Sequence, residues 1–298
     1  MHAPGFSELI IILINVMKKL KETLFILILN LVVITPFQKS FAGQACSKDV
    51  VCVDAVQKEN TIAFSVKNLQ TAEITITFEF EEFEKLTATM SFPYTATYPG
   101  LKTTNAFTLA ISDPQAWKYK YTYYWVWGTL QAKHDDSYMY SLPYASGQSY
   151  VVIRGSNANS STSGDEQYAI EWAMPEGSPV HAARSGTVVG VKDTNTTGGS
   201  GEEYRDYTNY IMIKHADGTI GEYDHLQAHG AKIQVGHHVQ VGQLIGLSGN
   251  TGDSSAPNLW FVVYKPLDGK RLQSFPIRFL TREGLAVILE QGESYTAF

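Results

Sequence analysis

The sequence predicts an all-β protein made of two domains, and three observations support this. Aromatic residues make up 12% of the 298 residues, with 17 Tyr and 14 Phe, a composition typical of strands. Apolar and polar residues alternate over residues 74–80 and 119–127, and no long segment has a helical period. Beyond residue 166, short apolar runs are separated by glycines. The net charge of −6 gives no reason to expect nucleic-acid binding.

The N-terminus has the pattern of a secretory signal. Three lysines precede an apolar run over residues 24–33, and small residues stand three and one positions before a cut after Ala42. We therefore predict a signal peptide over residues 1–42, with Met17 as the true start. An uncleaved membrane anchor is the alternative, but the apolar run is short for a bilayer span. The prediction is an exported protein, periplasmic or secreted, without a stable membrane span after cleavage.

The only two cysteines, Cys46 and Cys52, follow this cut closely. In an exported protein such a pair is typical of a disulfide that closes a small loop. Lipidation of Cys46 is the alternative, but the preceding Gly43-Gln44-Ala45 lacks the large aliphatic residue of a lipoprotein signal.

Residues 43–153 are predicted to form an antiparallel β-sandwich. Two alternating runs indicate its strands, and turn signals at residues 98–100 and 112–114 separate them. The apolar positions of these runs are Ile74, Ile76, Phe78, Phe80, Tyr119, Tyr121, Tyr123, Trp125 and Trp127. The aromatic run could be a platform for sugar rings, but we favour side chains that fill the core or the contact with the next domain.

Residues 154–166 are rich in Ser, Asn, Gly and Thr, and are predicted to be a linker. The second domain then begins with short strands and glycine-marked turns, which indicates a compact and strongly bent sheet. Strands are expected at 187–191, 210–214, 219–223 and 258–264, turns at 235–236, 241–242 and 245–246, and an exposed loop at 195–205.

Four motifs of this second region resemble the lysostaphin/LytM-type zinc peptidoglycan endopeptidases. They are residues 177–189, Tyr223-Asp224-His225-Leu226, Val241 to Gly246, and Gly249-Asn250-Thr251-Gly252. Their order and spacing extend from about Tyr168 to Phe279. The resemblance implies the duplicated hybrid motif, an antiparallel β domain with a central groove, over residues 167–280. Residues 281–298 would then be a C-terminal extension.

The resemblance also implies where a zinc site would lie. In active members one zinc ion is bound by a His and an Asp near the domain start and by the second His of a final His-x-His. The first His of that pair and the His of the Tyr-x-His-Leu segment assist the reacting water. The matching positions here are Thr162 or Gln167 for the first His, Glu171 for the Asp, and Asn258 and Trp260 for His-x-His, while His225 is retained.

These substitutions remove the chemistry of the site. An indole nitrogen has no free lone pair for a metal, so Trp260 cannot be a ligand. Asn258 is neutral and cannot act as a general base. One carboxylate, Glu171, falls short of a three-ligand zinc site. We therefore predict that zinc, the cofactor expected for the family, is lost, and that no other cofactor and no peptidase activity by the family mechanism are present.

Two groove residues keep alternative interpretations. His225 is either structural or part of a binding site. Trp260 either fills the volume left by the ion or, with Asn258 and Tyr264 on the same face, offers a surface to a glycan or peptide. The remaining histidines are interpreted as surface or hydrogen-bonded residues, and include His181, His215, His229, His237 and His238.

The favoured functional hypothesis is an exported, non-catalytic LytM-like protein that binds peptidoglycan or regulates a cell-wall hydrolase. The first alternative is an active metalloendopeptidase with a rebuilt metal site around Glu171 and His225. The second is a structural or adhesive surface protein whose N-terminal domain carries the binding.

Overall fold

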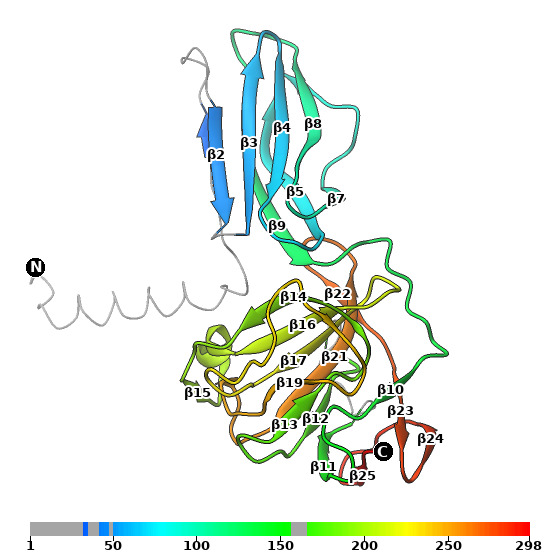
Figure 1. The fold of residues 1–298 in the computed structure, drawn as a ribbon. Helices are drawn as coiled ribbons and strands as arrows, with labels where there is room; N and C mark the ends of the chain where they lie inside the picture. The colour runs from blue at the N-terminus through cyan, green and yellow to red at the C-terminus, as the bar shows by residue number, and fades with distance from the viewer. Residues whose placement is uncertain (1–31, 35–41, 48–49, 156–165) are drawn as a thin grey trace, which may run out of the picture.

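A computed structural model describes residues 32–34, 42–47, 50–155 and 166–298 of the chain. Nearly all regular structure in these residues is β, with one 3-10 helix, η1 (Glu202–Tyr207). Figure 1 shows two bodies, with the N-terminal strands in one and the later strands in the other. The predicted all-β class is confirmed.

The N-terminal body is a sandwich of two antiparallel sheets. The first sheet has the order β2-β3-β4-β8-β6 and the second the order β1-β9-β5-β7. The strands are β1 (Val32–Ile34), β2 (Ala42–Ser47), β3 (Val51–Lys58), β4 (Thr61–Asn68), β5 (Ile74–Glu84), β6 (Leu86–Thr87), β7 (Tyr94–Tyr98), β8 (Thr103–Ile111) and β9 (Lys118–Trp127).

Aromatic side chains fill the interior of this sandwich. Tyr119, Tyr121 and Tyr123 are all at most 2% exposed, and they come from the alternating aromatic run of β9. The ring of Phe64 meets that of Tyr121 edge to face, with centroids 5.1 Å apart. These tyrosines therefore belong to the core and do not form a platform for sugars, which confirms the favoured interpretation of the aromatic run.

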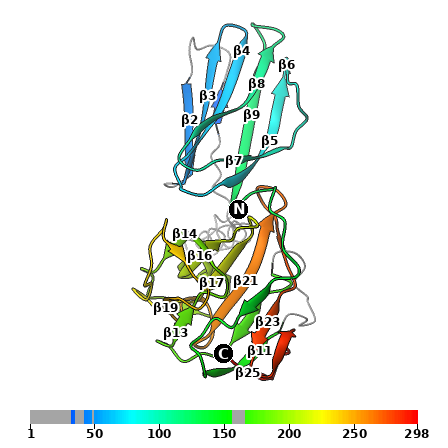
Figure 2. The same cartoon turned by 45° about the vertical axis from the view of Figure 1, so that its right-hand side comes forward.

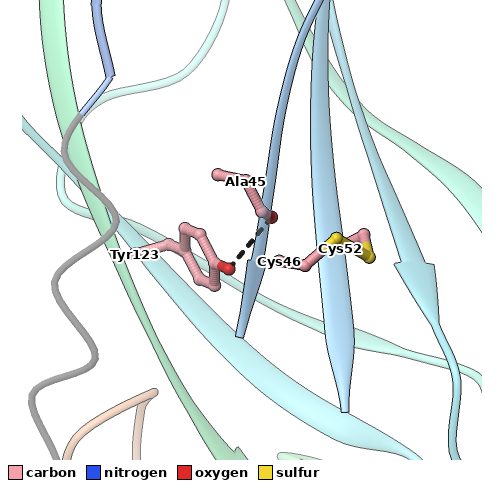
Figure 3. Close-up of a disulfide and its surroundings, with 4 residues drawn as sticks. All are labelled: Ala45, Cys46, Cys52 and Tyr123. Atoms are coloured by element: carbon pink, nitrogen blue, oxygen red, sulfur yellow. Dashed lines mark hydrogen bonds between the residues drawn. A yellow bond between two sulfur atoms is a disulfide. The ribbon is translucent and has the colours of Figure 1, made fainter. Parts of the chain in front are cut away.

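The two cysteines lie opposite each other on β2 and β3 and form the predicted disulfide, with their Cα atoms 4.0 Å apart. Figure 3 shows the bridge beside Ala45, whose carbonyl accepts a 3.1 Å hydrogen bond from the Tyr123 hydroxyl. The disulfide thus joins the two strands of one sheet, while Tyr123 ties that sheet to β9 in the other.

The second body is built around a nine-stranded sheet with the order β18-β14-β16-β17-β21-β12-β11-β25, to which β22 adds by pairing with β21. Smaller sheets pair β10-β23-β24, β13-β19 and β15-β20. The strands are β10 (Met139–Ser141), β11 (Ser149–Arg154), β12 (Ile170–Trp172), β13 (Pro179–His181), β14 (Gly186–Lys192), β15 (Gly198–Gly199), β16 (Tyr210–Lys214), β17 (Ile220–Asp224), β18 (His238–Val239), β19 (Leu244–Leu247), β20 (Gly252–Asp253), β21 (Leu259–Pro266), β22 (Leu272–Ser274), β23 (Arg278–Thr281), β24 (Gly284–Val287) and β25 (Ser294–Thr296).

The strand pairing corrects the predicted domain limits. β10 pairs with β23, and β11 pairs with β12 and β25, so residues 139–154 belong to the second body and not to a sandwich over 43–153. For the same reason residues 281–298 are part of its sheets and not an added extension. Within the predicted signal peptide, residues 1–31 and 35–41 lie outside the described residues, while Val32–Ile34 pair with β9.

The four strands expected in the second region are all present. β16 coincides with its predicted range, and β14, β17 and β21 differ from theirs by one or two residues at an end. The turn expected at 245–246 is wrong, because both residues lie inside β19. The loop expected at 195–205 is held by β15, which pairs with β20, and by η1.

The two faces of the large sheet have different neighbours. The inner face contributes buried residues such as Ile211, Tyr223 and Phe261 to the main core. The outer face carries a smaller apolar cluster around Met212, Val262 and Tyr264, against which Ala72 and Trp127 of the sandwich pack.

The sandwich therefore rests on one end of this outer face (Figure 2). Lys270 adds an ion pair of 2.7 Å to Glu79, and the Gly269 amide donates to the Thr77 hydroxyl at 2.8 Å. A Cβ atom at Gly269 would lie 2.4 Å from the Tyr124 carbonyl oxygen, so this close approach requires glycine. Among the described ranges, no helix has the length and apolarity that a membrane crossing requires.

Candidate functional site

Six side chains form a row across the outer face of the large sheet. The row lies at the end of this face that is away from Ile220 and Tyr264, which belong to the apolar cluster shared with the sandwich. Antiparallel partners in register point to the same face, so these residues share one surface. The row runs in the order Arg154, Glu171, Trp260, Asp224, Tyr210, Lys192 across β11, β12, β21, β17, β16 and β14. We refer to it as the Trp260 row.

Trp260 lies in the middle of the row, between two carboxylates. Its strand neighbours Leu259 and Phe261 are fully buried in the main core, whereas Trp260 itself is half-buried at the edge of the outer cluster. Glu171 lies on one side of it and Asp224 on the other. The indole therefore stands at the centre of the surface where the resemblance implies a metal.

Glu171 is paired with a guanidinium on its far side. Arg154 Nη1 lies 3.8 Å from Glu171 Oε1 and 3.7 Å from Glu166 Oε2. Burial raises the pKa of Glu171, and the Arg154 charge opposes that shift. Glu171 thus remains on the groove face at the family's aspartate position, but it is engaged by a cation of this chain.

Two further acids lie on β17, and neither was predicted from the sequence as a site residue. Glu222 and Asp224 are two residues apart on the same face, with Glu222 between Met212 and Val262. Burial raises the pKa of Glu222 to about 7, and burial together with the Glu222 charge raises the pKa of Asp224 well above its usual range. Asp224 Oδ1 is inaccessible to solvent and has no hydrogen-bond partner in the part of the chain that the structure describes.

Tyr264 does not offer a surface to a ligand, which corrects one interpretation above. It is 2% exposed within the cluster that the sandwich covers, and its hydroxyl donates to Met212 Sδ at 3.9 Å. The sandwich therefore covers the Tyr264 end of the outer face. Trp260, four residues earlier on β21, stays half-buried.

His225 follows β17 directly, where the chain turns with a left-handed φ of 65°. Its ring is 9% exposed, and Nδ1 lies 2.8 Å from the Thr251 carbonyl oxygen. Because a carbonyl only accepts, Nδ1 carries the hydrogen and Nε2 carries the lone pair. Burial lowers the pKa of His225, which keeps it in this neutral form.

Asn258 lies two residues before Trp260, and strand alternation places it on the same face. It is 6% exposed, and its Nδ2 donates to Ser254 Oγ at 2.9 Å and to the Ala256 carbonyl at 3.1 Å. Its Oδ1 has no partner among the described residues. This position therefore offers a buried acceptor where the family has an imidazole.

The remaining predicted positions differ in their burial. Thr162 lies outside the described residues, and Gln167 is exposed in a turn. His215 is buried with Nδ1 3.0 Å from the Ser185 carbonyl oxygen, and His181 is half-buried, while His229, His237 and His238 are exposed. In the described ranges no three His, Cys, Asp or Glu side chains gather as a metal site would require.

Comparison with known proteins agrees with the sequence motifs. Residues 165–274 match the sequence profile of peptidase family M23. The chain carries an M23 domain of the LytM and lysostaphin type. This domain contains the Trp260 row except for Arg154, together with His225 and Asn258.

Several characterised relatives match the M23 domain. A glycyl-glycine endopeptidase of Staphylococcus capitis is 34% identical over 44% of this chain, and lysostaphin of Staphylococcus simulans is 36% identical over 33% of it. The peptidoglycan DD-endopeptidase ShyA of Vibrio cholerae is 34% identical over 30% of this chain. These matches cover only 32%, 18% and 18% of the relatives' own lengths.

A solved structure covers a similar part of the chain. The catalytic domain of lysostaphin from Staphylococcus simulans aligns over 48% of this chain and 95% of that domain, at 28% identity and a TM-score of 0.30. The family assignment therefore rests on the sequence matches.

Arg154, Lys192, Tyr210 and Glu222 were not predicted as site residues. Strand alternation could have found Glu222 and Asp224, because both flank the buried Tyr223 and must face the other way. No sequence signal could have placed Arg154 beside Glu171, since the two belong to strands whose pairing is decided only by the folded sheet.

Proposed function

We propose that this chain is an exported, non-catalytic M23 protein whose groove binds peptidoglycan peptides. The observation that carries the proposal is the Trp260 row, in which an indole separates the two carboxylates Glu171 and Asp224. An indole cannot bind zinc, and the carboxylates on its two sides belong to strands that are not neighbours. The family fold supports a cell-wall ligand, and the Cys46–Cys52 disulfide supports export to an oxidising compartment.

Incubation of the purified protein with isolated sacculi tests both parts of this proposal. We expect the protein to sediment with the sacculi and to release no muropeptides above a boiled control. Elemental analysis of the same preparation is expected to find less than 0.1 zinc per chain, an order-of-magnitude limit for a site without three ligands. Muropeptide release that His225→Ala abolishes, or stoichiometric zinc that Glu171→Gln removes, would contradict the proposal.

Restoring the family residues provides a matched positive control. The quadruple variant Gln167→His, Glu171→Asp, Asn258→His, Trp260→His is expected to gain about one zinc per chain, because it supplies a three-ligand site with an open position. A second quadruple variant with Thr162→His in place of Gln167→His decides which position corresponds to the first ligand. If neither variant binds zinc, the correspondence of positions is wrong.

A further inference from the structure

Beside Trp260 the M23 domain holds buried hydrogen-bond acceptors that have no donors in the described part of the chain. Asp224 Oδ1 and Asn258 Oδ1 are both buried atoms without a partner in the described part of the chain, and Asn258 is 6% exposed. His225 adds an acceptor at Nε2, since its Nδ1 is bound to the Thr251 carbonyl. A buried acceptor left unpaired costs about 1–3 kcal/mol, so a ligand that brings N–H groups would gain from binding here.

Most of the ionisable side chains around these acceptors are acids. Glu222 and Asp224 lie together on β17, and Glu166 raises the pKa of both, while Glu171 lies across Trp260. Asp253 adds its charge near Glu171 and His225.

Two cations face this group, and both are already engaged. Arg154 contacts Glu166 and Glu171, and Lys192 donates to the Asp206 carbonyl oxygen at 2.6 Å. Five acidic side chains against these two bases form a surface on which a bound cation would favour the ionised forms of Glu222 and Asp224, whose pKa values burial raises.

Trp260 places an aromatic ring in the middle of this surface. It is half-buried between Glu171 and Asp224, with Tyr210 next in the row beyond Asp224. A cation over the face of an indole is attracted by the ring quadrupole, and the attraction grows when the cation is desolvated. An aromatic ring flanked by carboxylates therefore suits an organic cation.

A metal ion fits this arrangement poorly. Glu171 and Asp224 belong to the two strands that flank β21, so their backbones are about 10 Å apart at the usual strand spacing. A metal needs its oxygen ligands within about 2.0–2.6 Å, and the indole stands between the two carboxylates.

We propose that the Trp260 row, together with Asn258, is a binding site for the primary ammonium group of a peptide. The ammonium would lie over the indole of Trp260, with Asp224 and Glu171 on either side and the Asn258 oxygen as a further acceptor. This inference rests on the proposed function and names the group of the cell-wall peptide that the groove recognises.

Isothermal titration calorimetry with a defined pair of peptides tests the proposal. The probes are Nα-acetyl-L-Lys-D-Ala-D-Ala and the same peptide acetylated on Nε, in which a neutral acetamide replaces the primary ammonium group. We expect at least about tenfold weaker binding of the Nε-acetylated peptide, because one charged contact of roughly 1.4 kcal/mol is lost. In the variants Asp224→Asn and Trp260→Leu the free-amine peptide is expected to lose at least about fivefold in affinity.

The exposed carboxylate Glu59 supplies a matched control, since Glu59→Gln makes the same change of charge between β3 and β4 of the sandwich, outside the M23 domain. Its affinity for the free-amine peptide is expected to equal that of the unchanged protein. Thermal unfolding of each variant separates loss of binding from loss of folding.

Equal affinity for the two peptides, or no binding of either, overturns the ammonium site, as does unchanged affinity in both Asp224→Asn and Trp260→Leu. Sedimentation with sacculi is measured in parallel. Sacculus binding without discrimination between the peptides defeats only the ammonium site, whereas selective peptide binding without sacculus binding defeats only the proposed function.

Discussion

The two faces of the large sheet differ in what their residues contact. On the inner face Ile211, Ile213, Tyr223, Phe261 and Val263 are all fully buried in one apolar core. On the outer face their immediate neighbours in sequence include Glu222, Asp224 and Trp260, and Asp224 Oδ1 has no hydrogen-bond partner in the described residues. The same strands therefore supply a stabilising apolar face and a face that carries poorly solvated acids.

This difference separates stability from function within single strands. Burying an apolar residue stabilises the fold without further conditions, whereas a buried carboxylate costs free energy unless it is paired. The outer face keeps Glu222 and Asp224 at that cost in free energy. Buried groups with shifted pKa values gather at functional sites, so this face is the one that we associate with function. The inner face has its own buried titratable group, His215, which lies next to Gly221 on that side of the sheet.

The largest expected effect contrasts two neighbouring residues on opposite faces. Phe261→Ala should lower the free energy of unfolding by about 3–5 kcal/mol, because it opens a cavity in the core. Trp260→Ala should cost only about 1–2 kcal/mol, because the indole is half-buried and water can enter the space it leaves. Chemical denaturation followed by near-ultraviolet circular dichroism measures both. Equal losses in the two variants would mean that Trp260 is a core residue and not part of a binding surface.

The second effect concerns His215 on the inner face. Burial lowers the pKa of His215 to about 4. Between about pH 4 and 6.5 the unfolded chain therefore binds a proton at this residue and the folded protein does not. The contribution of His215 to stability should be constant above about pH 6.5, and it should lower stability by roughly 2–3 kcal/mol as the pH drops toward 4. Unfolding of His215→Gln across this range should lack that component, while His238→Gln, at an exposed position, should retain it. The same pH slope in both variants would refute the assignment.

The smallest effect has the opposite sign and belongs to the outer face. Burial raises the pKa of Glu222 to about 7, so its contribution to stability is fully present below about pH 4.5 and is lost as the pH rises through 7. We expect a loss of about 1–2 kcal/mol over this range, reduced by the partial exposure of the side chain. Glu222→Gln should remove this slope and Glu290→Gln should not. If the stability of Glu222→Gln and that of the unchanged protein change by the same amount between pH 4.5 and 7, Glu222 does not titrate as expected.

Much of the inner face, and the absence of a metal-binding side chain at residue 260, could be predicted from the sequence. Alternation in 74–80 and 119–127 identifies strands and the side that carries their large apolar residues, because successive side chains point to opposite faces. Short apolar runs between glycines identify the strands at 210–214 and 219–223. The identity of residue 260 alone excludes a metal ligand there, since an indole has no free lone pair. These conclusions depend on one residue or one strand at a time.

Only the tertiary structure decided which residues stand side by side. The Trp260 row joins strands in the order β11-β12-β21-β17-β16-β14, so Arg154 and Lys192 end up at the two ends of a surface centred on residue 260. The domain boundary moved for the same reason, because β10 and β11 pair with β23 and β25, which follow more than a hundred residues later. The alternation of side chains in a strand determines which face of that strand is buried. The hydrogen bonds between strands, however, join backbone groups that every strand offers. The packing of the whole sheet therefore decides which strand lies beside which.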